Sequence, residues 1–94
     1  MKKSIVSNEH KCLICGTTNN LHRHHIFMGT ANRQKSEEDG CWCYLCVWHH
    51  NGSNQGVHYN KGLDRNLKQH CQRRWEAIYG TREDFIKRYG KSYI

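Results

Sequence analysis

The chain has 94 residues and a formal charge of +7, because 15 Lys and Arg outnumber eight Asp and Glu. This length excludes a large enzyme and predicts a single domain over residues 1–94, whose thin core needs a further stabiliser. The positive charge favours a polyanion such as nucleic acid as the partner.

Six Cys and eight His suggest that this stabiliser is a metal ion. Small secreted domains held by disulfides typically contain more than about 8–10% Cys, and residues 1–10 have no apolar run of the kind found in a signal peptide. No stretch approaches the length that crosses a bilayer. We therefore expect a cytoplasmic protein without a membrane partner, whose reduced thiols are available to bind metal.

The composition changes along the chain. Residues 1–10 are polar and are expected to be flexible. Residues 11–60 contain almost all of the Cys and His, and residues 61–94 have the spacing of helices. The chemistry is therefore expected in the middle part.

A Cys-x-x-Cys pair comes first in this middle part. Cys12 and Cys15 have the spacing that lets two thiolates of one tight turn bind a tetrahedral ion. A second pair at the same spacing is either Cys43 with Cys46 or Cys46 with His49. We prefer the latter, because residues three apart on a strand point to opposite faces. The predicted structural Zn²⁺ site has no open position and consists of Cys12, Cys15, Cys46 and His49.

Two short runs in the same part are predicted to be strands. Residues 21–27 and 42–47 are rich in aromatic, β-branched and other apolar residues and are bounded by turn formers, which favours an antiparallel pair. Residues 31–40 are expected to form the loop between the strands. Three Cys outside the zinc site are predicted to be buried thiols, namely Cys41, Cys43 and Cys71.

From Leu63 the apolar residues follow helical spacing, which predicts a helix to about Tyr79. Gly80 suits the left-handed conformation that ends a helix. The inward face of this helix would consist of Leu63, Leu67, Cys71, Trp75, Ile78 and Tyr79.

Residues 81–84 have the pattern of a capping box and predict a second helix. Phe85, Ile86 and Tyr89 would face inward, and Gly90 would end the helix.

Histidine is unusually dense between the two Cys pairs and just after them. A neutral imidazole binds divalent metals, and its pKa of about 6.5 allows it to take a proton near neutral pH. We expect His10 and His70 to be surface residues, whereas His22 belongs either to the surface or to a site. The remaining candidates for a site are His24, His25, His50 and His58.

Three motifs follow one another along the chain: the Cys-x-x-Cys at Cys12, the doublet His24-His25, and the sequence LCVWHH at residues 45–50. In this order they resemble the HNH, or ββα-metal, endonucleases, especially small phage and prophage members with a zinc-stapled hairpin. The resemblance covers residues 12–60. It implies a small α+β fold with a zinc-stapled ββα-metal core and C-terminal helices.

The resemblance also implies a function, which is metal-dependent hydrolysis of phosphodiester bonds in double-stranded DNA. His25 would be the general base. His24, His50 and His58 would hold one divalent cation, Mg²⁺, Mn²⁺, Ni²⁺ or Zn²⁺, on the scissile phosphate. His49 stands where most relatives have a fourth Cys.

One element of the family pattern is absent. The Asn that orients the general base normally precedes the LC sequence by a few residues, and this place falls near Cys41. Asn51, Asn54, Asn60 or a backbone carbonyl could take its role.

Basic side chains could bind the phosphate backbone with salt-sensitive affinity. The alternative to a nuclease is a zinc-ribbon protein that binds nucleic acid without cutting it, and a protein-interaction module is a third possibility. The predicted nucleic-acid contacts are Arg23, Arg33, Arg65, Lys68 and Arg73.

Overall fold

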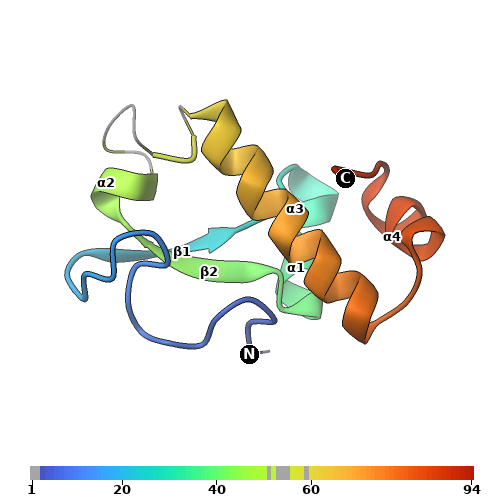
Figure 1. The fold of residues 1–94 in the computed structure, drawn as a ribbon, viewed down its shortest axis with the longest axis horizontal. Coiled ribbons are helices and arrows are strands. Elements are labelled where there is room, and N and C mark those ends of the chain that lie inside the picture. The colour runs from blue at the N-terminus through green and yellow to red at the C-terminus, as the bar shows by residue number, and fades with distance from the viewer. Residues whose placement is uncertain (1–2, 51, 53–55, 59) are drawn as a thin grey trace.

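The computed structural model describes residues 3–50, 52, 56–58 and 60–94. It has the expected α+β composition, with one two-stranded antiparallel sheet and four helices in this part of the chain (Figure 1). Within the described ranges, no helix combines the length and apolar character needed to span a membrane. The elements in chain order are β1 (Leu21–His25), α1 (Thr30–Asp39), β2 (Trp42–Cys46), α2 (Val47–His50), α3 (Lys61–Ile78) and α4 (Arg82–Tyr89).

The two predicted strands are confirmed, although each ends earlier than expected. In the antiparallel pair Leu21 lies opposite Cys46, and His25 lies opposite Trp42. All residues of β2 except Tyr44 are buried, so β2 is the inner strand of the sheet. This register places the start of β1 next to the end of β2, where α2 begins.

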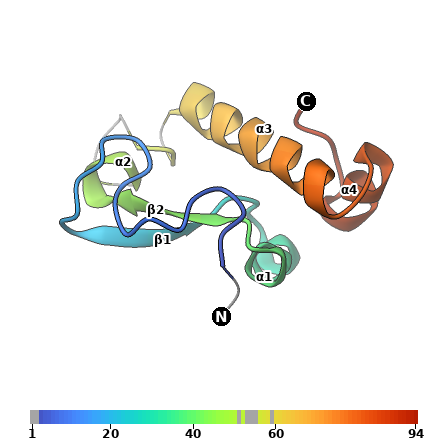
Figure 2. The same ribbon diagram turned by 60° about the horizontal axis from the view of Figure 1, so that its bottom comes forward.

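The prediction of a loop over residues 31–40 is wrong, because these residues form α1. Many of its residues have good helix propensity, and Gly40 ends the helix in the left-handed conformation. Only Ser36 and Asp39 are buried in it, so the sequence has no apolar stripe to reveal a helix. Figures 1 and 2 both show α1 at the end of the sheet opposite α2.

Residues 1–10 are expected to be flexible, and in the part that the structure describes, which excludes residues 1–2, polar contacts attach Ser4 and Ile5 to the rest of the fold. Ser4 is buried and its hydroxyl donates a hydrogen bond to the carbonyl of Trp42. The backbone N–H of Ile5 donates to the carbonyl of Gly40 at 2.9 Å. Arg74 in α3 donates to the carbonyl of Ile5 at 3.1 Å. Hydrogen bonds that involve backbone groups therefore hold Ser4 and Ile5 against β2, the end of α1 and α3.

The helix α3 confirms the predicted long helix and begins at Asn60, whose side chain accepts a hydrogen bond from the Leu63 N–H at 3.0 Å. Its inward face is shorter than predicted, because Ile78 and Tyr79 are exposed. Gly80 does not adopt the left-handed conformation.

The helix α4 has the predicted capping box between Thr81 and Asp84. Phe85 and Tyr89 are buried and Gly90 ends the helix with a φ of 94°. Ile86 is exposed, so its predicted inward orientation is wrong. An eight-residue helix buries a narrow stripe, and positions 85 and 89, one turn apart, fill it.

An aromatic cluster forms the core between the sheet end and the C-terminal helices. The ring centroid of Phe27 lies 5.1 Å from that of Phe85 and 4.6 Å from that of Tyr89.

The three thiols predicted to be buried are completely buried, which confirms that prediction for Cys41, Cys43 and Cys71.

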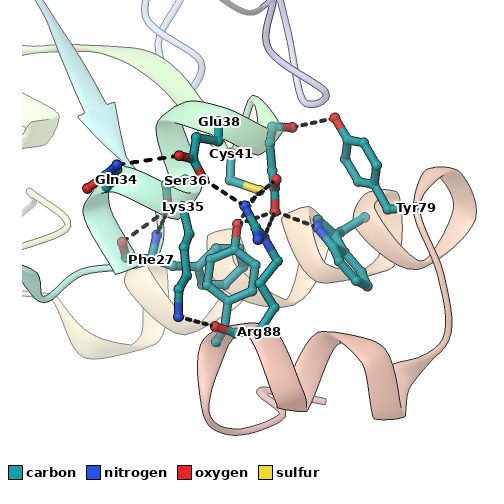
Figure 3. A network of polar contacts seen from close by, with 11 residues as sticks. Phe27, Gln34, Lys35, Ser36, Glu38, Cys41, Tyr79 and Arg88 are labelled. Atoms are coloured by element: carbon teal, nitrogen blue, oxygen red, sulfur yellow. Dashed lines mark hydrogen bonds and ion pairs between the residues drawn. The ribbon is translucent and has the colours of Figure 1, made fainter. Parts of the chain in front are cut away.

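Asp39, the last residue of α1, joins this helix to α3 and α4. Figure 3 shows the polar network to which Tyr79 and Arg88 belong. Its carboxylate accepts hydrogen bonds from Trp75 Nε1 at 2.9 Å, Tyr89 OH at 2.7 Å and Arg88 Nε at 2.6 Å. The Tyr79 hydroxyl donates to its backbone carbonyl at 2.7 Å. The hydrogen bond to Asp39 raises the pKa of Arg88, so this guanidinium stays charged.

We expect Asp39→Ala to lower the free energy of unfolding by about 3–5 kcal/mol, because it leaves the Arg88 charge and two buried donors without their acceptor. Urea denaturation of the metal-loaded protein measures this loss. Glu38→Ala is the matched control: Glu38 is exposed and also contacts Arg88, at 3.0 Å, and an exposed ion pair contributes at most about 1 kcal/mol. Equal losses in the two variants would contradict the central role of Asp39.

Candidate metal centres

The first candidate centre joins the N-terminal turn to the end of β2. A tight turn brings Cys12 and Cys15 together, with the Gly16 N–H donating to the Cys12 carbonyl at 2.9 Å and Gly16 in the left-handed conformation at φ 78°. Cys46 ends β2 and His49 lies in α2. The four ligand atoms all lie within 4.8 Å of one another. We call this cluster of Cys12, Cys15, Cys46 and His49 the cysteine clip.

The separations within the cysteine clip suit a tetrahedral ion. Sγ of Cys15 lies 3.7 Å from Sγ of Cys46, and Nδ1 of His49 lies 3.7 Å from Sγ of Cys12 and 3.3 Å from Sγ of Cys46. A tetrahedral ion with ligands at about 2.0–2.3 Å requires neighbouring ligand atoms about 3.3–3.8 Å apart. The cysteine clip could therefore bind a metal such as zinc.

The thiols of the chain differ in their readiness to ionise. Burial acts to raise the pKa of Cys12, but hydrogen bonds from backbone N–H groups of the clip outweigh it and lower this pKa to about 6. Burial raises the pKa of Cys46. A bound dication would displace the proton of this thiol. Burial raises the pKa of Cys43 to about 12. Cys43 lies outside the cluster of ligand atoms, so the structure favours the Cys46 and His49 pair over Cys43 and Cys46.

The second candidate centre contains the imidazoles of His24 in β1, His50 in α2 and His58 in the segment that follows. One ring nitrogen of each lies within 4.8 Å of the others. Nε2 of His50 and Nε2 of His58 are 3.1 Å apart. Backbone hydrogen bonds from Val57 to the His49 carbonyl at 2.8 Å and from His58 to the His50 carbonyl at 3.2 Å hold this segment against α2. We call the three residues the imidazole cluster.

The environment of the imidazole cluster fits a cation. His24 is buried, and among the described residues its Nε2 has no hydrogen-bond partner. Burial lowers the pKa of His24 to about 3 and that of His50 to about 4, with the neighbouring imidazoles adding to both effects. Both rings are therefore neutral near pH 7, which is the form that binds metals. An unpartnered buried nitrogen costs free energy that a bound cation would recover.

His22 belongs with this cluster, an outcome that the sequence left open. Its Nδ1 lies 2.9 Å from Nδ1 of His50, whose Nε2 faces His58. Residues 22 and 24 are two apart on β1 and therefore share one face. This spacing is the feature of the sequence that could have placed His22 beside His24. A histidine that binds metal through one nitrogen usually hydrogen-bonds through the other, and His22 is placed to accept that bond.

His25 lies between two hollows. A hollow of about 190 Å³ is lined by the imidazole cluster together with Arg23, His25, Met28 and Arg33. A second hollow, of about 460 Å³, is also lined by His25 and includes Glu37 of α1. His25 Nε2 lies 2.6 Å from a carboxylate oxygen of Glu37. His25 can thus contact a group bound beside the imidazole cluster.

Of the Asn candidates for orienting His25, the structure describes Asn60, and it is not seen in that role. Asn60 uses its side chain to cap α3. Asn51 and Asn54 lie outside the described residues. Cys41 is buried in the core, and its sulfur accepts a hydrogen bond from the Tyr89 hydroxyl at 3.6 Å.

The predicted nucleic-acid residues divide into two groups. Arg23 and Arg33 line the hollow beside the imidazole cluster. Lys68 on α3 pairs with Asp64 at 2.8 Å, and its charge helps to lower the pKa of His24 after burial and the neighbouring imidazoles. The others on α3 are exposed and comprise Arg65 and Arg73.

We compared the chain with models of protein families, with curated proteins and with solved structures, and none of the three comparisons gave a match.

We expect Cys15→Ser to weaken metal binding and to destabilise the fold. Cys15 is exposed, so its replacement removes little packing, and any loss reports on the metal site itself. Metal analysis after dialysis and urea denaturation measure the two effects, with the exposed Thr18→Ala, three residues further along the chain, as the control. A Cys15→Ser protein that keeps its metal and unfolds at the same urea concentration as the wild type would show that the cysteine clip is not a metal site.

Proposed function

We propose that the protein is a metal-dependent endonuclease of the HNH, or ββα-metal, type that hydrolyses phosphodiester bonds in DNA. The observation that carries the proposal is the convergence of three imidazoles in a hollow that His25 and two arginines also line. The order of the elements supports it, because β1 supplies His24 and His25, and the helix that follows β2 supplies His50.

In this proposal the imidazole cluster holds one divalent cation against the scissile phosphate. When bound, the cation supplies charge stabilisation to the phosphate and to the leaving oxygen. His25 lines the same hollow and takes the proton of the attacking water. Arg23 and Arg33 lie where they can contact the phosphates on either side.

The cysteine clip has a supporting role in this proposal. The helix α2 has only four residues, and it contains His49 of the cysteine clip next to His50 of the imidazole cluster. Such a short helix has little stability of its own. A metal in the cysteine clip would therefore fix α2, and with it His50, relative to β1.

We expect the wild-type protein to nick supercoiled plasmid in the presence of Mg²⁺, Mn²⁺ or Ni²⁺. His25→Ala should lower the rate by about 10²–10⁴-fold, because it removes the general base, while DNA binding is kept. His70→Ala, an exposed histidine on α3, is the matched control and should cut like the wild type.

The competing function is a zinc-ribbon protein that binds nucleic acid without cutting it. Wild-type protein that shifts DNA but never nicks it with any of these metals would support this function and refute the nuclease. Equal cutting by the wild type and His25→Ala would refute the assignment of His25 as the base.

Salt dependence of DNA binding tests the predicted basic contacts. Arg65 is exposed and lies one turn before Lys68, which is close to His24. Arg65→Ala should therefore reduce the slope of log affinity against log salt concentration by about 0.9, the value for one phosphate contact. Arg82→Ala on α4 is the control, and fluorescence anisotropy with a duplex measures both. An unchanged slope for Arg65→Ala would remove this residue from the interface.

A further inference from the structure

The carboxylate of Glu37 bridges two side chains of β1. One oxygen, Oε1, lies 2.9 Å from Nη2 of Arg23, and the other, Oε2, lies 2.6 Å from Nε2 of His25. Arg23 and His25 are two residues apart on the strand and therefore share one face. Glu37 reaches this face from α1, which packs against β1. A single carboxylate thus closes a three-residue arrangement across two elements.

Arg23 holds this carboxylate in place. Its guanidinium carbon lies 3.9 Å from the ring centroid of Trp42, and Trp42 is the residue paired with His25 in the sheet. Trp42 is buried. Stacking on an aromatic face and an ion pair each restrict an arginine side chain. The position of Glu37 is therefore fixed by the same strand pair that carries His25.

We propose that Glu37 is the residue that positions His25. A carboxylate oxygen accepts hydrogen bonds, so the 2.6 Å contact places a proton on Nε2 of His25. Nδ1 is then the nitrogen of this ring that is left to accept a proton. The geometry assigns to Glu37 the orienting role for which the sequence offers no Asn near Cys41.

The use of this orientation in catalysis rests on the proposed nuclease function. Glu37 lines the larger hollow and holds the Nε2 edge of the His25 ring. The Nδ1 edge of this ring therefore points away from Glu37, and His25 also lines the hollow of the imidazole cluster. Free rotation or exchange between the two tautomers would leave the basic nitrogen correctly placed only part of the time. Holding the tautomer therefore raises the rate of the chemical step without contacting the substrate.

The first test uses nitrogen NMR of histidine-labelled, metal-loaded protein, above the ordinary pKa of imidazole. We expect His25 of the wild type to show the Nε2-protonated tautomer. Glu37→Ala should give a mixture of tautomers, whereas Glu37→Gln, whose amide oxygen still accepts a hydrogen bond, should keep the Nε2-protonated form. Glu38→Gln, the next carboxylate of α1, is the control that leaves the spectrum of His25 unchanged. A wild-type His25 in the other tautomer, or a spectrum unaffected by Glu37→Ala, would overturn the proposal.

The second test is kinetic. Glu37→Ala should lower kcat for plasmid nicking by about 10–100-fold with KM unchanged, and Glu37→Gln should recover most of this loss. A rise in KM alone, or equal loss in both variants, would overturn the positioning role. If the wild type does not cut DNA, the nuclease proposal fails, and the tautomer spectra alone still decide whether Glu37 orients His25.

Discussion

The arrangement of this protein depends on one linkage, in which the turn at Cys12 and Cys15 meets the end of β2 and the start of α2. Three thiols and one imidazole converge there at separations that a tetrahedral ion requires. His49 and His50 are consecutive, so the cysteine clip and the imidazole cluster share the four-residue helix α2. Fixing one cluster therefore fixes part of the other.

Burial gives the imidazole cluster its chemistry. His24 is buried, with its ring centroid 5.5 Å from that of His58, and its low pKa keeps the ring neutral. Three histidines so close together would repel one another if they were charged, which favours the neutral form further. In the proposed nuclease, the same enclosure would place the cation directly beside His25.

Much of the candidate site could be predicted from sequence, because metal ligands have characteristic types and spacings. The Cys-x-x-Cys at Cys12 meets the pair at Cys46 and His49 in one cluster. The doublet at His24 and His25 lines the hollow that also contains His50 and His58. The preference for His49 over Cys43 followed from strand geometry alone. Both strands were predicted from apolar and aromatic runs bounded by turn formers, α3 from its helical spacing, and α4 from its capping box.

The rest could not be predicted, because it depends on polar side chains without a periodic pattern. The helix α1 buries Ser36 and Asp39 instead of an apolar stripe, so it was expected to be a loop. Glu37 was consequently placed in a loop, and its contact with His25 depends on the packing of α1 against β1. Ser4 likewise binds a backbone carbonyl that only the fold brings close.

The most direct test of the central claim is anomalous diffraction from crystals of the protein grown with Zn²⁺ and then exposed to Mn²⁺. Two separate ion positions are expected, one enclosed by Cys12, Cys15, Cys46 and His49, and one bound by His24, His50 and His58 with an open coordination position. A single position, or ions that bind neither cluster, would contradict the account.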